Sequence, residues 1–282
     1  MSLLHERGSN SVGKLRFGTS GYSYKDWEGV LYPAGTPPSE YLSMYAREFD
    51  MAELNFSYYK MPDASLSRRM ASCTGSNFLF SVKGHKTLTH EGSAATVNRE
   101  VAAFLRGIEP ITDAGKLGMV LLQFPFGFHY TASNRTYVHT LCGLLTQVPV
   151  AIEFRNREWQ RTAVYDGLRD RTITLVNVDE PALPGLPEPT SLVTAAAGYV
   201  RFHGRNRENW WKGDNVTRYD YSYSDAELQE WVPRIQAMAL QAAVIMVVFN
   251  NHSKGQAVQN VRRLKEIIAT AAKGQKGAHA SC

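Results

Sequence analysis

Charged and polar side chains recur near the ends of seven apolar segments of this sequence, and their types suit acid–base and anion-binding chemistry. Carboxylates and an imidazole, which can transfer protons, are the candidate catalytic groups: Glu53, Glu153, Asp179 and His203. Amides and cations near the same segment ends are the candidate substrate-binding groups: Asn55, Lys83, Gln123, Arg155, Arg201, Arg205, Asn250 and Asn251. Guanidinium groups match the oxygens of phosphate or carboxylate. The pattern predicts a polar, net-positive pocket for a small anionic substrate.

Alternation within the apolar segments indicates that these groups share one face. Neighbouring residues of a strand point to opposite faces, and residues 198–204 set Val200 and Phe202 against Arg201 and His203. Because helices pack on apolar surface, we expect the apolar set to face the helices and the polar set to face the interior. Arg201 and His203 are therefore predicted to lie in the pocket.

The segment 173–179 is interpreted by the same rule. Val176 and Val178 are expected to pack under the helices, and Asn177 and Asp179 are expected to face the interior with the other polar groups. This assignment is what makes Asp179 a candidate catalytic carboxylate.

Structural ion pairing is the alternative role for any single charged residue of this set. Glu153 and Arg201, for example, can form a pair that only fills the interior. Burying the whole set without a ligand or water would cost many kcal/mol, because each charge loses its hydration. The sequence therefore favours a pocket that is wet or occupied.

The elements that position these residues are short strands alternating with helices. The predicted strands cover residues 14–20, 51–57, 78–85, 118–125, 150–156, 173–179, 198–204 and 244–250. Ser224 and Glu227 form a capping-box pattern at the start of one predicted helix, and the last helix is expected over residues 255–268. Residues 180–191 contain four prolines, so a rigid loop is predicted where the sixth helix would stand.

This order predicts one α/β domain, a (β/α)8 TIM barrel of parallel strands over residues 14–268. Residues 1–13 and 269–282 are predicted to be flexible segments on either side of it. Barrels of this kind place their active sites at the carboxyl ends of the strands, where the polar residues stand. An open doubly wound sheet is the alternative fold, but no GxGxxG pattern follows the first strand.

Composition narrows the class of protein further. The chain has 282 residues, a net charge of +5 and a hydrophobic content of 44%, as a globular domain with a mild preference for anionic partners would. Its cysteines, Cys73, Cys142 and Cys282, have no disulfide-framework or zinc spacing. No secretory signal or membrane-length apolar run is present, so a cytoplasmic protein without a membrane partner is expected. The oligomeric state is not determined by the sequence.

Long motifs around the strand ends resemble the domain-of-unknown-function-72, or YecE-like, family. They include FGTSGYSYKDWEGVLYP (17–33), AELNFSYYKMP (52–62), FSVKGHKTLTH (80–90), AIEFRNREW (151–159), YVRFHGRN (199–206) and VVFNNHSKGQAVQN (247–260). The resemblance covers nearly the whole chain from about residue 16 and implies a TIM barrel, but it carries no established reaction. Residues 56–59 are Phe-Ser-Tyr-Tyr, where the family more often has Ser-Thr-Phe-Tyr. This difference does not change Glu53 or Asn55.

Three classes of function fit the predicted pocket. The first is a hydrolase or lyase that acts on an anionic, phosphorylated or nucleotide-like substrate, whose ring could stack on loop aromatics: Tyr22, Tyr24, Trp27, Tyr58, Trp159, Trp210 and Trp211. The second is a metal-dependent enzyme resembling sugar isomerases or endonucleases of this fold. The third is a non-enzymatic protein that binds anions or nucleic acid, which would need a basic surface stripe.

A metal site would have to use Glu153, Asp179 and His203, which close three consecutive strands. Asn250 stands where the sugar isomerases have a fourth carboxylate, and the neighbouring arginines would repel a cation. No metal or other cofactor is therefore predicted.

A second anion position is predicted between the last two strand-end loops. Helix N-termini attract anions, and a helix is expected to begin near Gly255. Arg205 and Lys254 would add positive charge there, and Asn251 would add side-chain donors. We therefore expect phosphate or sulfate to bind at Arg205, Asn251 and the first turn of this helix.

Overall fold

The computed structural model describes residues 12–214 and 216–279, and its centre is a closed barrel of eight parallel strands in sequence order. Each strand pairs with its neighbours along the chain, and β1 pairs with β8 to close the ring. The strands are β1 (Lys14–Ser20), β2 (Met51–Leu54), β3 (Leu79–Lys83), β4 (Leu117–Phe124), β5 (Val150–Phe154), β6 (Thr174–Asp179), β7 (Ala197–Phe202) and β8 (Val244–Phe249). This is the predicted TIM barrel.

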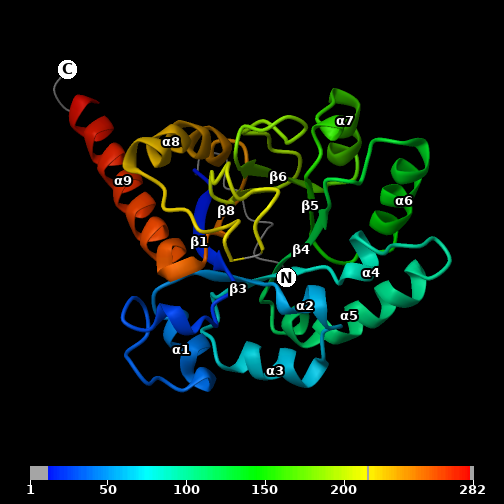
Figure 1. Cartoon of the computed structure of the whole chain (residues 1–282), viewed down its shortest axis with the longest axis horizontal. Helices are drawn as coiled ribbons and strands as arrows, with labels where there is room; N and C mark the ends of the chain where they lie inside the picture. Colours follow the sequence, from blue (N-terminus) through cyan, green and yellow to red (C-terminus); the bar gives the residue numbers. More distant parts are fainter. Residues whose placement is uncertain (1–11, 215, 280–282) are drawn as a thin grey trace.

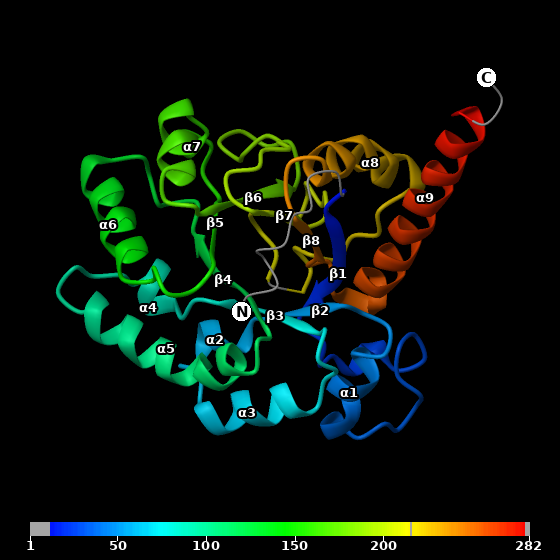
Figure 2. The ribbon, with the colours of Figure 1, turned by 180° about the vertical axis from the view of Figure 1, so that it is seen from behind.

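Helices cover the outside of the barrel, as Figures 1 and 2 show. They are α1 (Tyr41–Tyr45), α2 (Phe56–Tyr59), α3 (Ala64–Ser72), α4 (Lys86–Thr89), α5 (Val97–Asp113), α6 (Ala132–Gly143), α7 (Thr162–Arg169), α8 (Asp225–Ala239) and α9 (Gln256–His279). Ser224 and Glu227 form the predicted capping box at the start of α8. Apolar residues on the outer face of the strands, such as Val120, Val200 and Phe202, pack against these helices in one continuous core.

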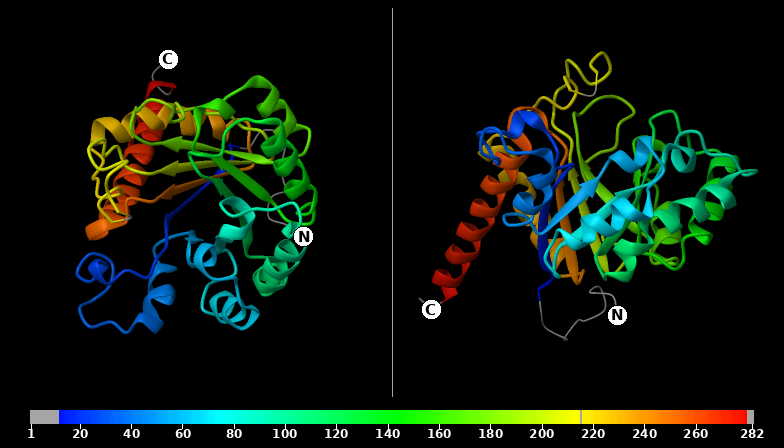
Figure 3. Two further views of the ribbon diagram at one scale, coloured as in Figure 1. Left: turned by 45° about the vertical axis from the view of Figure 1, so that its right-hand side comes forward. Right: turned by 90° about the horizontal axis from the view of Figure 1, so that it is seen from below.

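A second apolar cluster fills the inside of the barrel below the site. Its members are Met51, Leu79, Met119, Leu121, Ala151, Val176, Val178, Ala197, Tyr199, Val244, Met246 and Val248. These side chains come mostly from the first halves of the strands, so the polar residues that follow them are stacked toward the carboxyl ends. Figure 3 shows the strand-end loops gathered at that end of the barrel.

The connection from β6 to β7 contains no helix, which confirms the predicted proline-rich loop. Asn177 on β6 holds this loop against the outside of the barrel: its Oδ1 accepts from Thr190 Oγ1 at 2.7 Å and from the Leu192 amide at 2.8 Å. Its Nδ2 donates to the Leu192 carbonyl at 3.0 Å. Polar side chains can therefore face outward here, because a polar loop and not an apolar helix covers the strand.

The predicted orientation of the β6 side chains was wrong for this reason. Val176 and Val178 belong to the inner cluster, whereas Asn177 and Asp179 point outward. The rule that apolar residues face the helices fails where the helix itself is missing.

The last helix is longer than predicted, because α9 continues to His279 through residues where a tail is expected to begin. Figure 1 shows its C-terminal turns extending away from the barrel. The predicted flexible segment 1–13 lies outside the described residues except for Val12 and Gly13, and the Gly13 amide donates to Ala239 at 2.7 Å. Of the described residues, no helix is long and apolar enough to cross a membrane.

Candidate active site

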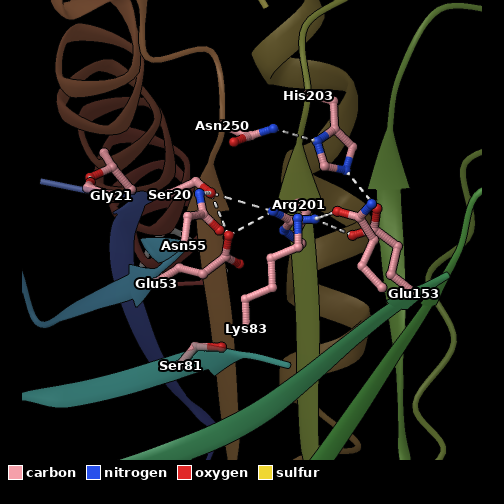
Figure 4. Close-up of polar contacts among 12 residues, drawn as sticks. Ser20, Gly21, Glu53, Asn55, Ser81, Lys83, Glu153, Arg201, His203 and Asn250 are labelled. Atoms are coloured by element: carbon pink, nitrogen blue, oxygen red, sulfur yellow. Dashed lines mark hydrogen bonds and ion pairs between the residues drawn. The ribbon is translucent and has the colours of Figure 1, made fainter. Parts of the chain in front are cut away.

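Arg201 is the centre of the polar layer at the carboxyl ends of the strands. It extends from β7 into the barrel, and its side chain is 1% exposed. One guanidinium nitrogen lies 2.6 Å from Glu53 Oε1 on β2, and another lies 2.5 Å from Glu153 Oε2 on β5 (Figure 4). Because both carboxylates are fully buried, the arginine stabilises two charges that have lost their hydration, and Arg155 supplies the second positive charge.

Glu53 is fixed by hydroxyl groups as well as by Arg201. Its Oε2 lies 2.7 Å from the Tyr199 hydroxyl, and the Ser20 hydroxyl donates to its Oε1. Asn55 Nδ2 in turn donates to Ser20 Oγ at 2.6 Å. Both carboxylate oxygens of Glu53 therefore already accept hydrogen bonds, and the residue forms part of the floor of the site.

Glu153 is held between two arginines and a histidine. Arg155 Nε donates to its Oε1, and His203 Nε2 lies 3.2 Å from the same oxygen. Burial alone would raise the pKa of Glu153, but the positive charges of Arg201 and Arg155 hold it well below its ordinary value. Glu153 is therefore a permanent anion of the floor and a poor proton donor or acceptor.

His203 is a neutral hydrogen-bonding group with a defined tautomer. Its Nδ1 faces two donors, Arg155 at 3.2 Å and Asn250 Nδ2 at 3.1 Å, so Nδ1 must accept and the proton must sit on Nε2, toward Glu153. Complete burial, followed by the positive charge of Arg155, lowers the pKa of His203 to about 3. The ring thus orients Arg155 and Glu153 instead of exchanging protons near neutral pH.

The depressed pKa of His203 predicts a loss of stability in acid. The unfolded histidine titrates near 6.5 and the folded one near 3, so unfolding takes up one proton between these values. We expect His203 to contribute about 1.4 kcal/mol per pH unit to the fall in unfolding free energy as the pH decreases from 6 to 4. Denaturant titrations of wild type and His203→Gln over this range should show a shallower slope for the variant. Parallel curves would contradict the buried, neutral histidine.

Glu180 is a buried carboxyl group that the sequence analysis did not single out. It follows β6 directly, and its Oε2 accepts from Arg155 at 3.2 Å. Burial raises the pKa of Glu180 to about 8, so the group is largely protonated at neutral pH. Its position immediately after Asp179, in a strand whose register was misassigned, explains why it was missed.

A cavity of about 540 Å³ opens above this network at the strand ends. Its lining consists of cations, amides, imidazoles and phenols: Tyr24, Asn55, Tyr58, Tyr59, Lys83, His90, Gln123, Arg201, Arg218, Tyr219, Asn250 and His252. No carboxylate of the described residues is among them. The volume is in the range of pockets that bind small molecules.

Two cations of the cavity wall have no carboxylate partner among the described residues. The Lys83 ammonium lies 4.7 Å from the centre of the Tyr58 ring, and Arg218 makes only a 3.5 Å contact with the Gly213 carbonyl. Figure 4 shows Lys83 extending from β3 toward Arg201. Burial, followed by the positive charge of Arg201, lowers the pKa of Lys83 to about 8. The wall is therefore positive, although the floor is electrically balanced.

Some residues of the cavity lining also carry buried polar atoms without a hydrogen-bond partner among the described residues. Within the described residues, the Nε hydrogen of buried Arg201 and the Nε hydrogen of Arg218 have no acceptor, and Asn55 Oδ1 has no donor. Buried polar groups normally find a partner, so ordered water or a small side-chain shift is expected at these atoms.

The structure brings nine of the twelve predicted site residues together. Asn55, Lys83, Gln123, Arg201 and Asn250 line the cavity, and Glu53, Glu153, Arg155 and His203 form the layer beneath it or beside it. All nine follow from the alternation in β2, β3, β4, β5, β7 and β8.

Asp179 is the first of three corrections, because it lies outside the barrel wall. Its carboxylate accepts from Trp231 Nε1 at 2.6 Å, from the Tyr223 hydroxyl at 2.7 Å and from Arg205 at 2.6 Å. It joins β6 to α8 and the loop before it. With Asp179 outside, the trio that the alternative metal hypothesis requires, with Glu153 and His203, is not assembled, and no group of three ligating side chains occurs among the described residues.

Arg205 and Asn251 are the other two corrections. Arg205 binds Asp179 and Glu230, the latter at 2.8 Å, because Gly204 has a φ of 87° and turns the chain out of the barrel after His203. Asn251 Nδ2 donates to the Tyr221 carbonyl and to Asn260 Oδ1, each at 2.8 Å. Both residues hold the outer layer together.

The second anion position, predicted beside the last helix, was also wrong. Asp26 accepts from the Lys254 amide at 2.6 Å, and Asp220 accepts from Lys254 Nζ at 2.7 Å. The protein's own carboxylates therefore take the positive groups that were assigned to phosphate.

Of the seven loop aromatics, two line the cavity, three are buried elsewhere, and the half-buried Tyr22 and the exposed Trp211 are not part of the lining. Tyr24 and Tyr58 line the cavity as the stacking hypothesis requires. Trp27, Trp159 and Trp210 are at most 3% exposed and pack in the interior or under the rim. Sequence reasoning missed the remaining loop residues of the lining, which are Tyr59, His90, Arg218, Tyr219 and His252. Tyr59, His90 and His252 lie within motifs quoted in the sequence analysis, at 52–62, 80–90 and 247–260, but nothing there assigned them to the pocket.

The fold and the site define a TIM-barrel protein with a polar, positively charged strand-end cavity above an ion-paired floor. The chain belongs to the family described as "Protein of unknown function DUF72", whose sequence model matches residues 16–281. The UPF0759 protein YunF of Bacillus subtilis is 30% identical over 257 residues, which cover 84% of this chain and 90% of that protein.

Solved structures of the same family share the fold. A DUF72 family protein of Thermotoga maritima is 37% identical, with a TM-score of 0.84 over 91% of this chain and 99% of the other. One from Enterococcus faecalis is 26% identical, with a TM-score of 0.82 over 90% of this chain and 95% of the other. The resemblance noted in the sequence is thus confirmed at the level of family and fold.

Proposed function

We propose that this protein is an enzyme of the hydrolase or lyase type that acts on a small anionic substrate in the strand-end cavity. The observation that carries the proposal is the pair of wall cations, Lys83 and Arg218, that have no carboxylate partner among the described residues. An anion is the ligand that would complete them.

The charge distribution supports an anionic ligand over a cationic one. In the floor, Glu53 and Glu153 are balanced by Arg201 and Arg155. Lys83 and Arg218 therefore set the sign of the potential in the cavity.

The aromatic lining supports a substrate with a ring. Tyr24 stacks on His252 with their ring centres 4.6 Å apart, and Tyr58 and Tyr219 line the same cavity. Aromatic faces of this kind bind sugars or bases. A phosphorylated or nucleotide-like compound would combine the ring with the charge.

The surface gives less support to nucleic-acid binding. Two arginines that could contribute to a basic stripe are ion-paired: Arg262 with Glu48 at 2.6 Å and Arg263 with Asp225 at 2.6 Å. Arg205 is paired as well. These three arginines are already neutralised by carboxylates, which favours a small substrate over nucleic acid.

Phosphate is expected to stabilise the folded protein more than chloride does at matched ionic strength. A ligand at one hundred times its Kd adds about 2.7 kcal/mol to the unfolding free energy. Thermal melts with increasing phosphate should show this shift in wild type, and Lys83→Met and Arg218→Gln should each reduce it. Lys60→Met is the matched control, because Lys60 is exposed outside the cavity.

Either of two results would overturn the binding site. One is the absence of any phosphate-specific shift for phosphate, pyrophosphate and AMP alike. The other is a shift of equal size in wild type, Lys83→Met and Arg218→Gln, because the anion would then bind elsewhere.

A further inference from the structure

Lys83 differs from a structural lysine of the same chain. Lys116 is buried outside the barrel interior, and its ammonium donates to the Ala71 carbonyl at 2.5 Å, the Thr74 carbonyl at 2.7 Å and Thr74 Oγ1 at 3.0 Å. The Lys83 ammonium has no hydrogen bond or ion pair within the described residues, and its contact is the Tyr58 ring. A lysine kept only to fill space would be satisfied as Lys116 is.

The position of Lys83 also directs its nitrogen at a bound ligand. The residue ends β3 on the inner face, and its side chain reaches over the floor toward Arg201 (Figure 4). It shares the cavity with Arg218, Asn55 and His90. A small ligand whose anionic group meets Arg218 would therefore place its other atoms within the cavity that Lys83 enters.

The surroundings of Lys83 make the amine nucleophilic. With a pKa of about 8, about one amine in ten is neutral at pH 7, against fewer than about one in a thousand for an ordinary lysine. Only the neutral amine can attack a carbonyl carbon, and lysines in desolvated sites beside other cations are known to act as such nucleophiles.

We propose that Lys83 forms an imine with the carbonyl carbon of the substrate, which makes the substrate class a small anionic aldehyde or ketone. This inference rests on the proposed function, because it assigns chemistry to the same cavity. It explains why a cation with no partner stands beside an otherwise fully paired floor.

The step balances without a further reactant. The neutral Lys83 nitrogen adds to the carbonyl carbon, and the C=O π bond becomes a C–O bond of a carbinolamine. One nitrogen proton moves to that oxygen, and the second follows as the C=N bond forms, so that the oxygen leaves as water and a neutral imine remains. His90 lines the cavity, and burial together with the charges of Lys83 and Arg155 lowers its pKa to about 4, so its neutral ring can relay the proton.

The imine would supply the electron sink that a lyase needs. A protonated imine withdraws electrons from the neighbouring carbon more strongly than a carbonyl group does, so a bond to that carbon breaks more readily. Of the two reaction types proposed above, hydrolase and lyase, the imine favours the lyase.

Reductive trapping with glyoxylate tests the proposal on the intact protein. Glyoxylate is an aldehyde that carries a carboxylate, and sodium borohydride reduces its imine to a stable carboxymethyl-lysine. Peptide mapping by mass spectrometry should find Lys83 modified at least tenfold faster than Lys60, an exposed lysine outside the cavity. Lys83→Arg keeps the positive charge, cannot form the imine, and should lose the fast modification.

The outcomes separate this inference from the proposed function. Modification of Lys83 at the rate of Lys60 would overturn the imine. Glycolate, which has a hydroxyl group in place of the aldehyde, then reports on anion binding alone. A glycolate or phosphate shift in thermal melts that persists without fast trapping leaves the anion site standing and removes only the covalent step. Fast trapping without any anion shift would retain the reactive lysine and contradict the anion site.

Discussion

Replacing Arg201 with Met should lower the free energy of unfolding by about 3–5 kcal/mol, because two buried carboxylates then lose their shared cation. Glu53 and Glu153 are both 0% exposed, and each accepts directly from Arg201. Urea titrations of wild type and variant at neutral pH measure the difference. Arg201→Lys should fall between the two, since an ammonium can pair with one carboxylate but cannot bridge both.

The pH dependence of this loss identifies its cause. In wild type the pKa of Glu153 is held well below 4.5 by Arg201 and Arg155, so its stabilising charge is present above 4.5 and lost only in stronger acid. In Arg201→Met the pKa should rise, and the carboxyl can take up a proton at milder pH. The difference between variant and wild type should therefore shrink from pH 8 to pH 5. A loss below about 1 kcal/mol at neutral pH would contradict the ion-paired floor.

Replacing Asp179 with Ala should lower the free energy of unfolding by about 3 kcal/mol without weakening the anion site. The indole of Trp231 and the hydroxyl of Tyr223 are buried donors to this carboxylate, and each costs about 1–3 kcal/mol when left unsatisfied. Arg205 is partly exposed and can turn to solvent or to Glu230. Chemical denaturation measures the loss.

Asp179→Asn is the matched control for that prediction. It preserves the shape and one acceptor oxygen, so it should be less destabilising than Asp179→Ala. Both variants should show the wild-type phosphate shift, because Asp179 lies outside the barrel. Loss of the phosphate shift in a folded Asp179→Asn protein would return this residue to the site and contradict its outward orientation.

The inner face of the barrel could be predicted wherever a helix covers the strand. The alternation of Val200 and Phe202 with Arg201 and His203 has a physical cause, because the helices require an apolar surface. On β6 that cause is absent: a polar loop packs on Asn177, and Trp231 and Tyr223 bind Asp179. The sequence shows the loop by its prolines, so the exception could have been recognised there.

The loop contribution to the cavity could not be predicted in the same way. His90 and Arg218 are separated by more than one hundred residues, and no periodicity fixes where loop side chains point. The same holds for Arg205, which the left-handed turn at Gly204 carries out of the barrel although it continues the alternation of β7. The spacing of residues predicts which way side chains point within a strand. It no longer does so after the first turn that follows the strand.

A crystal structure of the protein grown with phosphate tests the central claim most directly. Our account predicts phosphate density in the cavity, with oxygens at hydrogen-bond distance from Lys83 Nζ and the Arg218 guanidinium, neither of which has a carboxylate partner in the described chain. The same crystals of Lys83→Met should show weaker density or none. A cavity that holds only water, with phosphate bound at another surface, would contradict the assignment of this pocket as the site of an anionic substrate.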